Sequence, residues 1–173
     1  MKTYTIIFVV LFLLVGTSSA TDNDIKKKCE AAISNKFATW KRASIISEVA
    51  DWSKSRRQDP TEVYGDFNGD TYRDLALLIQ VGPKPKDDYP ERLDSLYIAI
   101  CLNNPPKVTL HLIEKPYCGD LIALSPKGKK YYNFDTGKTG RYRHDGVAAV
   151  CFEKAGATYI YTGKKFIKIA DSD

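Results

Sequence analysis

The sequence predicts an α+β fold, in which N-terminal helices pack on a largely antiparallel β-sheet meander of about eight short strands. Between Asp24 and Arg57, apolar residues recur at steps of three and four, which is the period of an amphipathic helix. After Pro60 the period changes to two, and short apolar runs are separated by turns of hairpin length. Helices followed by strands are typical of the α+β class.

Residues 1–20 predict a secretory signal peptide. Lys2 precedes the apolar run IIFVVLFLLVG, and the small residues Ser18 and Ala20 offer a cleavage site before Thr21. The run is short for a membrane span, which needs roughly 20 apolar residues. We therefore expect a secreted or periplasmic protein whose mature chain has no membrane span.

The mature chain, residues 21–173, is expected to form one globular domain, helical over 21–58 and β-rich over 59–173. Removal of Lys2 with the signal lowers the formal net charge from +5 to +4. Proteins that bind nucleic acids are usually more basic and carry the charge in a patch. No nucleic-acid partner is therefore expected.

The helical region divides into two stretches. The first carries apolar residues from Ile25 to Trp40, and the second carries them from Ile45 to Trp52, before Pro60 ends the region. At these spacings the two tryptophans are expected to be core residues.

The strands follow in short runs. In chain order these are EVYGDF, DLALLIQV, DSLYIAICL, KVTLHLIE, DLIALS, YYNF, GVAAVCFE, ATYIYT and GKKFIKIA. DLALLIQV is almost continuously apolar, which predicts a strand buried on both faces. The Pro-rich segment GPKPKDDYPERL between the second and third runs is expected to be a loop.

Four cysteines in an exported chain predict two disulfides. The shortest spacing favours Cys101–Cys118. If NNPP is a hairpin turn, however, Cys101 lies opposite about Val108, and Cys118 is roughly 30 Å further along at about 3.3 Å per residue. Bridged Cα atoms lie within about 7 Å. Either this strand register differs or Cys101 pairs with another cysteine, for example Cys151. The pairing of Cys29, Cys101, Cys118 and Cys151 therefore stays open.

The stretch GDFNGDTYRD predicts a calcium loop. Oxygen donors stand at alternate positions in Asp66, Asn68 and Asp70, Tyr72 would add its backbone carbonyl, and Asp74 completes the set. Calcium takes six to eight hard oxygen ligands from such short loops. A plain turn rich in Asp, Asn and Gly is the alternative.

An EF-hand needs Gly at position 6 and Glu at position 12 between helices, whereas these positions hold Thr71 and Leu77 between strand-like runs. GDFNGDTYRDLALL instead resembles an FG-GAP or VCBS-type repeat, the calcium loop of integrin-like propeller blades. The resemblance covers residues 64–78 in a single copy, so a full propeller is not expected. It implies calcium ligands at Asp66, Asn68, Asp70, Tyr72 and Asp74. Thr71 replaces the usual Gly, and a β-branched residue is unfavourable at positive φ.

The sequence contains no GxSxG, HExxH or P-loop pattern. The preferred interpretation is therefore a calcium-stabilised, non-catalytic recognition protein that binds another exported protein, in the manner of an inhibitor, an immunity protein or an adhesin. Tyr89 and Arg92, in the loop 82–93, are residue types enriched at binding hot spots, and we expect them to contact the partner. A merely solvated connection is the alternative for this loop.

Two other function classes remain open. A secreted hydrolase would use Glu114 and Asp120, which flank a turn, as a glycosidase-type carboxylate pair, or the carboxylates of the Pro-rich loop. A basic surface binder of anionic cell-wall polymers would use the segment Lys127–His144, KGKKYYNFDTGKTGRYRH.

Overall fold

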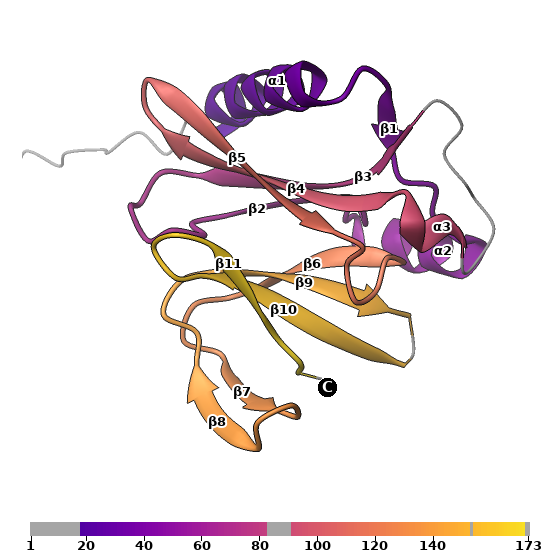
Figure 1. Ribbon diagram of the computed structural model, residues 1–173, viewed down its shortest axis with the longest axis vertical. Coiled ribbons are helices and arrows are strands. Elements are labelled where there is room, and N and C mark those ends of the chain that lie inside the picture. The colour runs from indigo at the N-terminus through magenta and orange to yellow at the C-terminus, as the bar shows by residue number, and fades with distance from the viewer. Residues whose placement is uncertain (1–17, 83–90, 153, 172–173) are drawn as a thin grey trace, which may run out of the picture.

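The computed structural model of the chain describes residues 18–82, 91–152 and 154–171. Three layers follow one another in Figure 1: helix α1 (Ser18–Lys36), a five-stranded antiparallel sheet, and a four-stranded antiparallel sheet. A two-stranded hairpin extends beyond the last layer. The α+β class predicted from the sequence is confirmed, and the described residues form neither a closed barrel nor a propeller.

The first sheet lies under α1 and has the strand order β1–β3–β4–β5. Its strands are β1 (Trp40–Arg42), β2 (Glu62–Gly65), β3 (Asp74–Val81), β4 (Leu96–Asn104) and β5 (Lys107–Glu114). Strand β2 also pairs with β3, opposite residues 74–77, whereas β1 pairs with residues 79–81. Strands β1 and β2 thus share one edge of β3, and β3 is central.

The second sheet has the order β11–β10–β9–β6. Its strands are β6 (Leu121–Ser125), β9 (Gly146–Cys151), β10 (Ala155–Tyr161) and β11 (Phe166–Ile169). Strands β7 (Lys130–Asn133) and β8 (Lys138–Arg141) are inserted between β6 and β9 and pair only with each other. They form the hairpin that projects from the body in Figure 1. The short helices are α2 (Ser47–Arg56) and α3 (Glu91–Asp94).

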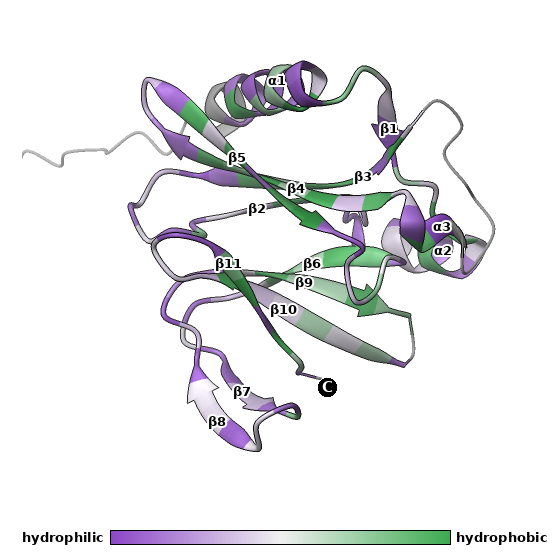
Figure 2. Ribbon diagram, viewed as in Figure 1, coloured by the Kyte–Doolittle hydropathy of each residue, from purple (hydrophilic) through white to green (hydrophobic). Residues whose placement is uncertain are grey.

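Two apolar cores explain the continuous apolar pattern of β3. Leu75, Leu77 and Ile79 face α1, and the alternate residues Ala76 and Leu78 face the second sheet. Because side chains alternate along a strand, a strand between two layers carries apolar residues on both faces, here from Leu75 to Ile79. In Figure 2 hydrophobic residues predominate along β4, β6 and β9, whereas the β7–β8 hairpin is mostly hydrophilic. Burial of each such side chain contributes about 1.5–3 kcal/mol.

The two disulfides are Cys29–Cys101 and Cys118–Cys151. The prediction of two bridges and the argument against Cys101–Cys118 are confirmed, whereas pairing of Cys101 with Cys151 is wrong. Cys101 lies opposite Leu110 rather than Val108, because the strands extend to Asn104 and Lys107 and leave only the two prolines in the turn. Two disulfides are consistent with an exported protein.

Three expectations for the N-terminal region need correction. Helix α1 begins at Ser18, earlier than Asp24, where the helical pattern of the sequence starts; residues 1–17 lie outside the described part. The first helical pattern ends at Lys36, and Trp40 opens a strand because the edge of β3 offers unpaired backbone groups. Neither tryptophan is a core residue: Trp40 is half-buried beside the core under α1, and Trp52 is half-buried against Phe152. No helix in the described residues is long and apolar enough to cross a membrane.

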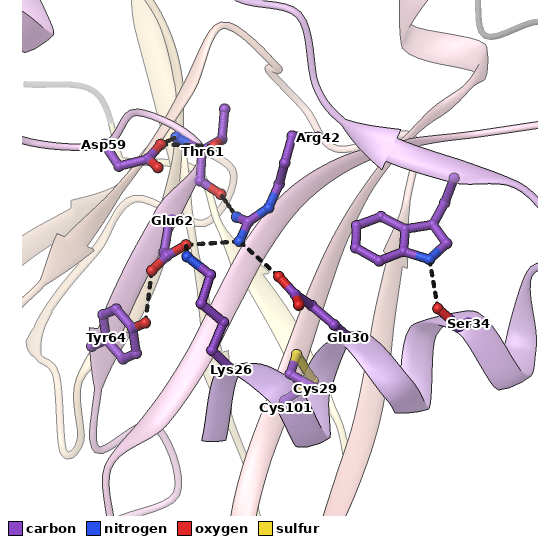
Figure 3. A network of polar contacts seen from close by, with 11 residues as sticks. Lys26, Cys29, Glu30, Ser34, Arg42, Asp59, Thr61, Glu62, Tyr64 and Cys101 are labelled. Carbon is purple, nitrogen blue, oxygen red and sulfur yellow. Dashed lines mark hydrogen bonds and ion pairs between the residues drawn. A yellow bond between two sulfur atoms is a disulfide. The ribbon is translucent and has the colours of Figure 1, made fainter. Parts of the chain in front are cut away.

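A polar network joins α1 to the first sheet (Figure 3). Glu62 Oε2 accepts hydrogen bonds from Lys26 Nζ and Arg42 Nη2, each at 2.7 Å, and its Oε1 accepts one from the Tyr64 hydroxyl at 2.7 Å. Burial raises the pKa of Glu62, but these donors outweigh it and hold the pKa below its ordinary value. The carboxylate therefore stays ionised and clamps a helix, β1 and β2 together.

Candidate functional site

The acidic loop, residues 65–74, connects β2 to β3, and its ends pair with each other as Gly65 and Asp74. The expected placement between two strands is therefore correct. Asp66 accepts backbone hydrogen bonds from Gly69 at 2.7 Å and from Thr71 at 3.1 Å. Asn68 Oδ1 accepts one from the N–H of Asp70 at 3.0 Å. These side chains fold the loop tightly because they satisfy its backbone donors.

Two loop residues have left-handed backbone conformations. Gly69 has φ of 81° and Thr71 has φ of 73°, so the Thr that replaces the usual Gly does stand at a positive φ. A Cβ on Gly69 would also lie 2.1 Å from His144 Nδ1, so any larger residue there would have to displace the His144 ring. The loop is therefore strained at Thr71 and closely packed at Gly69.

Asp74 anchors the loop to the interior. Its side chain is fully buried; Oδ2 accepts the N–H of Phe67 at 2.8 Å, and Oδ1 accepts the N–H of Asn103 at 2.7 Å. Burial raises the pKa of Asp74 to about 7; the two N–H donors oppose this shift, and the charges of Asp70 and Asp66 add to it. The three carboxylates are thus close enough to repel one another.

A fourth carboxylate reaches the loop from a distant turn. Asp145 Oδ2 accepts the N–H of Asp66 at 2.9 Å, and Oδ1 accepts the N–H of Lys127 at 2.9 Å. Asp145 returns a backbone hydrogen bond to the carbonyl of Asp66 at 3.2 Å. Sequence reasoning missed this residue, since nothing in the local pattern links positions 79 apart. It ties the acidic loop to the base of the β7–β8 hairpin.

The donor chemistry of the loop fits a hard divalent cation. Each carboxylate oxygen can accept two hydrogen bonds or ligands, so an oxygen bound to one backbone N–H keeps a site for calcium. The ion would be held by Asp66, Asn68, Asp70, Asp74 and the Tyr72 carbonyl. Within the described residues, however, no three His, Cys, Asp or Glu side chains are arranged around a common point. Binding would require the loop oxygens to turn toward a shared centre.

A basic cleft of about 460 Å³ lies beside the acidic loop. It is lined by Asn68, Tyr131, Arg141, Arg143, His144, Ile160, Tyr161, Thr162 and Gly163. Tyr131 stacks on Tyr142 with ring centroids 4.9 Å apart, and Tyr142 is buried with its hydroxyl donating to Asp171. The acidic loop, the hairpin with the residues that follow it, and the turn after β10 are far apart in sequence, and together they form one cationic, aromatic surface.

Of the two residues expected to contact a protein partner, the structure describes Arg92. Tyr89 lies outside the described residues. Arg92 is only 6% exposed, donates to the Gly119 carbonyl at 2.6 Å and lies 3.7 Å from Asp120. The buried guanidinium of Arg92 holds the segment before β6 in place.

The expected hydrolase pair has structural contacts of its own. Asp120 Oδ2 accepts the N–H of Phe152 at 3.0 Å, and its other oxygen faces Arg92. Glu114 is exposed at the end of β5, opposite Tyr97 in the ladder. Of the carboxylates assigned to the Pro-rich loop, Asp94 lies at the end of α3, which replaces the expected loop from Glu91 onward, and forms an ion pair with Lys115 at 3.0 Å. Asp87 and Asp88 lie outside the described residues, as does the side chain of Glu91.

Comparison of the chain with protein-family models, with curated proteins and with solved structures finds no match.

Proposed function

We propose that the chain is an exported, non-catalytic recognition protein that binds an anionic polymer of the cell envelope through the β7–β8 hairpin. The charge of the hairpin segment is the observation that carries this proposal. Residues 127–144 contain six Lys and Arg side chains and one Asp. That Asp135 lies 3.3 Å from Lys168 of β11, so the cations of the segment dominate its surface.

Exposed aromatic rings accompany these cations. Tyr132 and Phe134 are 46% and 58% exposed and pack edge to face with centroids 4.9 Å apart. Large exposed rings carry a solvation cost that a bound partner removes, and Tyr with Arg is a combination enriched at binding hot spots. A projecting hairpin with both features can lie along an extended chain of negative charges.

The acidic loop has a supporting role in this proposal. Calcium bound by Asp66, Asp70 and Asp74 would neutralise carboxylates that otherwise repel one another. Asp145 connects this loop to the hairpin base. A loop that calcium makes rigid would therefore also hold the base of the hairpin in place. A rigid surface loses less conformational entropy on binding than a mobile one.

The protein-binding alternative has less support. Its two expected contact residues were Tyr89 and Arg92, and Arg92 is buried. The basic residues of the hairpin segment, in contrast, are exposed. The anionic-polymer interpretation therefore takes precedence.

The test measures retention of the mature protein on immobilised polygalacturonate and poly(glycerol phosphate), with neutral dextran as the reference. We expect retention on at least one anionic polymer, and weaker retention at high salt because screening shortens the Debye length. The triple variant Lys127→Gln, Lys130→Gln, Lys138→Gln should weaken binding about tenfold or more. The proposal fails if the wild type binds neither anionic polymer.

A matched control removes the same charge elsewhere. Lys27→Gln, Lys36→Gln, Lys107→Gln changes three exposed lysines outside the hairpin. Retention should stay within about twofold of the wild type. An equal loss in both triple variants would mean that net charge, rather than the hairpin, determines binding.

A further inference from the structure

The basic cleft has the size and composition of a small-molecule subsite. Its volume of about 460 Å³ lies within the range of roughly 300–1,000 Å³ that is typical of ligand sites. It is enclosed by the end of the hairpin, the tip of the acidic loop and the turn between β10 and β11. The cleft can therefore hold one unit of a longer ligand.

Two arginines give the cleft its charge. Arg141 and Arg143 both line it, while Tyr142 between them is buried. This follows from the alternation of side chains along an extended segment. Arg141 Nη1 donates to the Gly128 carbonyl at 2.7 Å, which fixes the guanidinium and leaves its other donors for a ligand. Paired guanidinium groups match the oxygens of a carboxylate or phosphate.

Fixed tyrosine rings form other walls of the cleft. Tyr131 is supported from behind by the buried Tyr142, as described above. The Tyr161 hydroxyl donates to the Gly163 carbonyl at 3.0 Å, and its ring contacts Phe166 with centroids 5.2 Å apart. Rings that are held in place offer flat apolar surfaces at low entropic cost. Such a surface suits the apolar face of a sugar ring.

The wall toward the acidic loop is polar but uncharged. Asn68 lines the cleft, whereas the carboxylates of Asp66, Asp70 and Asp145 do not belong to its lining as far as the chain is described. Asp66 and Asp70 accept hydrogen bonds from backbone N–H groups of the loop. Asp145 accepts hydrogen bonds from the N–H groups of Asp66 and Lys127. Asn68 Nδ2 already donates to Asp70 Oδ2 at 2.8 Å and to Asn104 Oδ1 at 3.1 Å, so an anion in the cleft must be bound by the arginines and not by this amide.

The cleft continues onto the hairpin. A second depression, of about 420 Å³, is lined by Lys130, Tyr131, Thr139, Gly140 and Arg141. Tyr131 and Arg141 line both depressions and so stand between them. A ligand with repeating units can occupy both at once.

We infer that the basic cleft binds one carboxylate- or phosphate-bearing sugar unit, and that the neighbouring depression binds the next unit of the same anionic glycan. This inference rests on the proposed function for the identity of the polymer. It adds the subsite, the residues that form it and the class of unit that it accepts. Arg141 and Arg143 bind the anionic group, and Tyr131 and Tyr161 stack on the sugar.

The experiment measures binding of trigalacturonate and of a phosphorylated trisaccharide by calorimetry, with maltotriose as the neutral reference. Amide chemical shifts should move at residues 131, 141–144 and 161–163. Arg143→Gln should raise the Kd for the anionic probes at least tenfold, since Arg143 is exposed and its loss should not disturb folding. Lys164→Gln removes an equal charge next to the cleft without lining it, and it should change the Kd less than twofold.

The outcomes separate the subsite from the proposed function. If the wild type binds long polymers and Arg143→Gln binds them equally well, the subsite is wrong and the polymer-binding proposal stands. If the trisaccharides bind in the cleft and no long polymer is retained, the subsite stands and the polymer proposal is wrong. If single-stranded DNA of equal charge binds as tightly as trigalacturonate, the assignment to a glycan is wrong.

Discussion

Asp74 and Asn103 connect the start of β3 to the end of β4 through a hydrogen bond of 2.7 Å from the Asn103 backbone to a fully buried carboxylate. The ladder places Leu75 opposite Cys101, so this bond continues the sheet where regular pairing ends. The same carboxylate closes the acidic loop through Phe67. One ionisable side chain thus links the loop, the sheet edge and the core.

The first prediction concerns the pH dependence of stability without calcium. Burial raises the pKa of Asp74 from 3.8 to about 7. At pH values between 3.8 and about 7, Asp74 holds a proton in the folded state that it has lost in the unfolded state. The contribution of Asp74 to the unfolding free energy is therefore present at low pH and is lost as the pH rises through 7. In chelator, urea denaturation should show a smaller unfolding free energy at pH 8 than at pH 5.

Asp74→Asn is the matched variant for this measurement. It should be less stable overall, because an amide has one acceptor oxygen for two backbone N–H groups. It should also lose the fall in stability between pH 5 and 8 that Asp74 causes. His111, whose pKa burial lowers, contributes equally to both proteins. Parallel pH profiles for the two proteins would contradict the assignment.

The second prediction concerns calcium. With a Kd of about 0.1 mM and about 1 mM calcium, binding stabilises the fold by roughly 1.4 kcal/mol. For a domain of this size that raises Tm by about 3–6 °C. Thermal melting in calcium and in chelator measures the difference, and Asp70→Ala should abolish it. Equal Tm values for the wild type in the two buffers would remove the calcium proposal.

The third prediction concerns the strained residue of the acidic loop. Thr71 has φ of 73°, and a non-glycine residue in this region costs about 1–3 kcal/mol. Thr71→Gly should stabilise the protein by about 1 kcal/mol, after the greater flexibility of Gly in the unfolded chain is offset. Thr71→Ala keeps the Cβ atom and should give a smaller gain. Chemical denaturation of the three proteins tests this order.

The fourth prediction concerns the clamp at Glu62. Its side chain is 10% exposed and lies 2.7 Å from both Lys26 and Arg42. Glu62→Gln should lower the unfolding free energy by about 1–3 kcal/mol, the range for hydrogen bonds to charged groups. Glu30→Gln is the control, because Glu30 lies 3.6 Å from Arg42 with its side chain 39% exposed, and the loss should stay below about 1 kcal/mol. Equal losses would contradict the proposed importance of burial.

The fifth prediction concerns the bridge from α1 to β4. The Cys29–Cys101 bridge closes a loop of 72 residues, and the chain-entropy relation gives about 4 kcal/mol for such a loop. Replacement of both cysteines by Ala should lower the unfolding free energy by about 2–5 kcal/mol. The oxidised wild-type protein, when denatured, should show no titratable thiol. Four thiols in that assay would contradict both bridges.

The sequence predicts well what depends on neighbouring residues. The continuous apolar run of β3 indicates burial on both faces, and the period change at Pro60 separates the helices from the strands. The short strand β1 at Trp40 is not predicted from the sequence. It is a strand because it pairs with the edge of β3, and not because of its local propensity. Strand β8 is not predicted because Lys138–Arg141 contains no apolar residue. Only its pairing with β7 makes this segment a strand.

In the candidate site too, the sequence predicts the features that depend on neighbouring residues and misses those that depend on distant segments. The spacing of Asp66, Asn68 and Asp70 predicts a tight loop between strands, because each side chain satisfies a nearby backbone donor. The contribution of Asp145 and the burial of Arg92 depend on contacts between distant segments. No local pattern encodes these contacts, so the sequence alone places neither residue.

The two disulfides also determine how the protein responds to mechanical tension. They close two covalent rings, over residues 29–101 and 118–151. Between Cys29 and Cys151, an oxidised chain under load can lengthen only by extending residues 102–117, roughly 55–60 Å at about 3.5 Å per residue. Such extension would strip β5 from β4, while the acidic loop and the basic hairpin lie inside the rings. Tension applied across Cys29 and Cys151 would therefore extend β5 first and leave both of these regions inside closed rings.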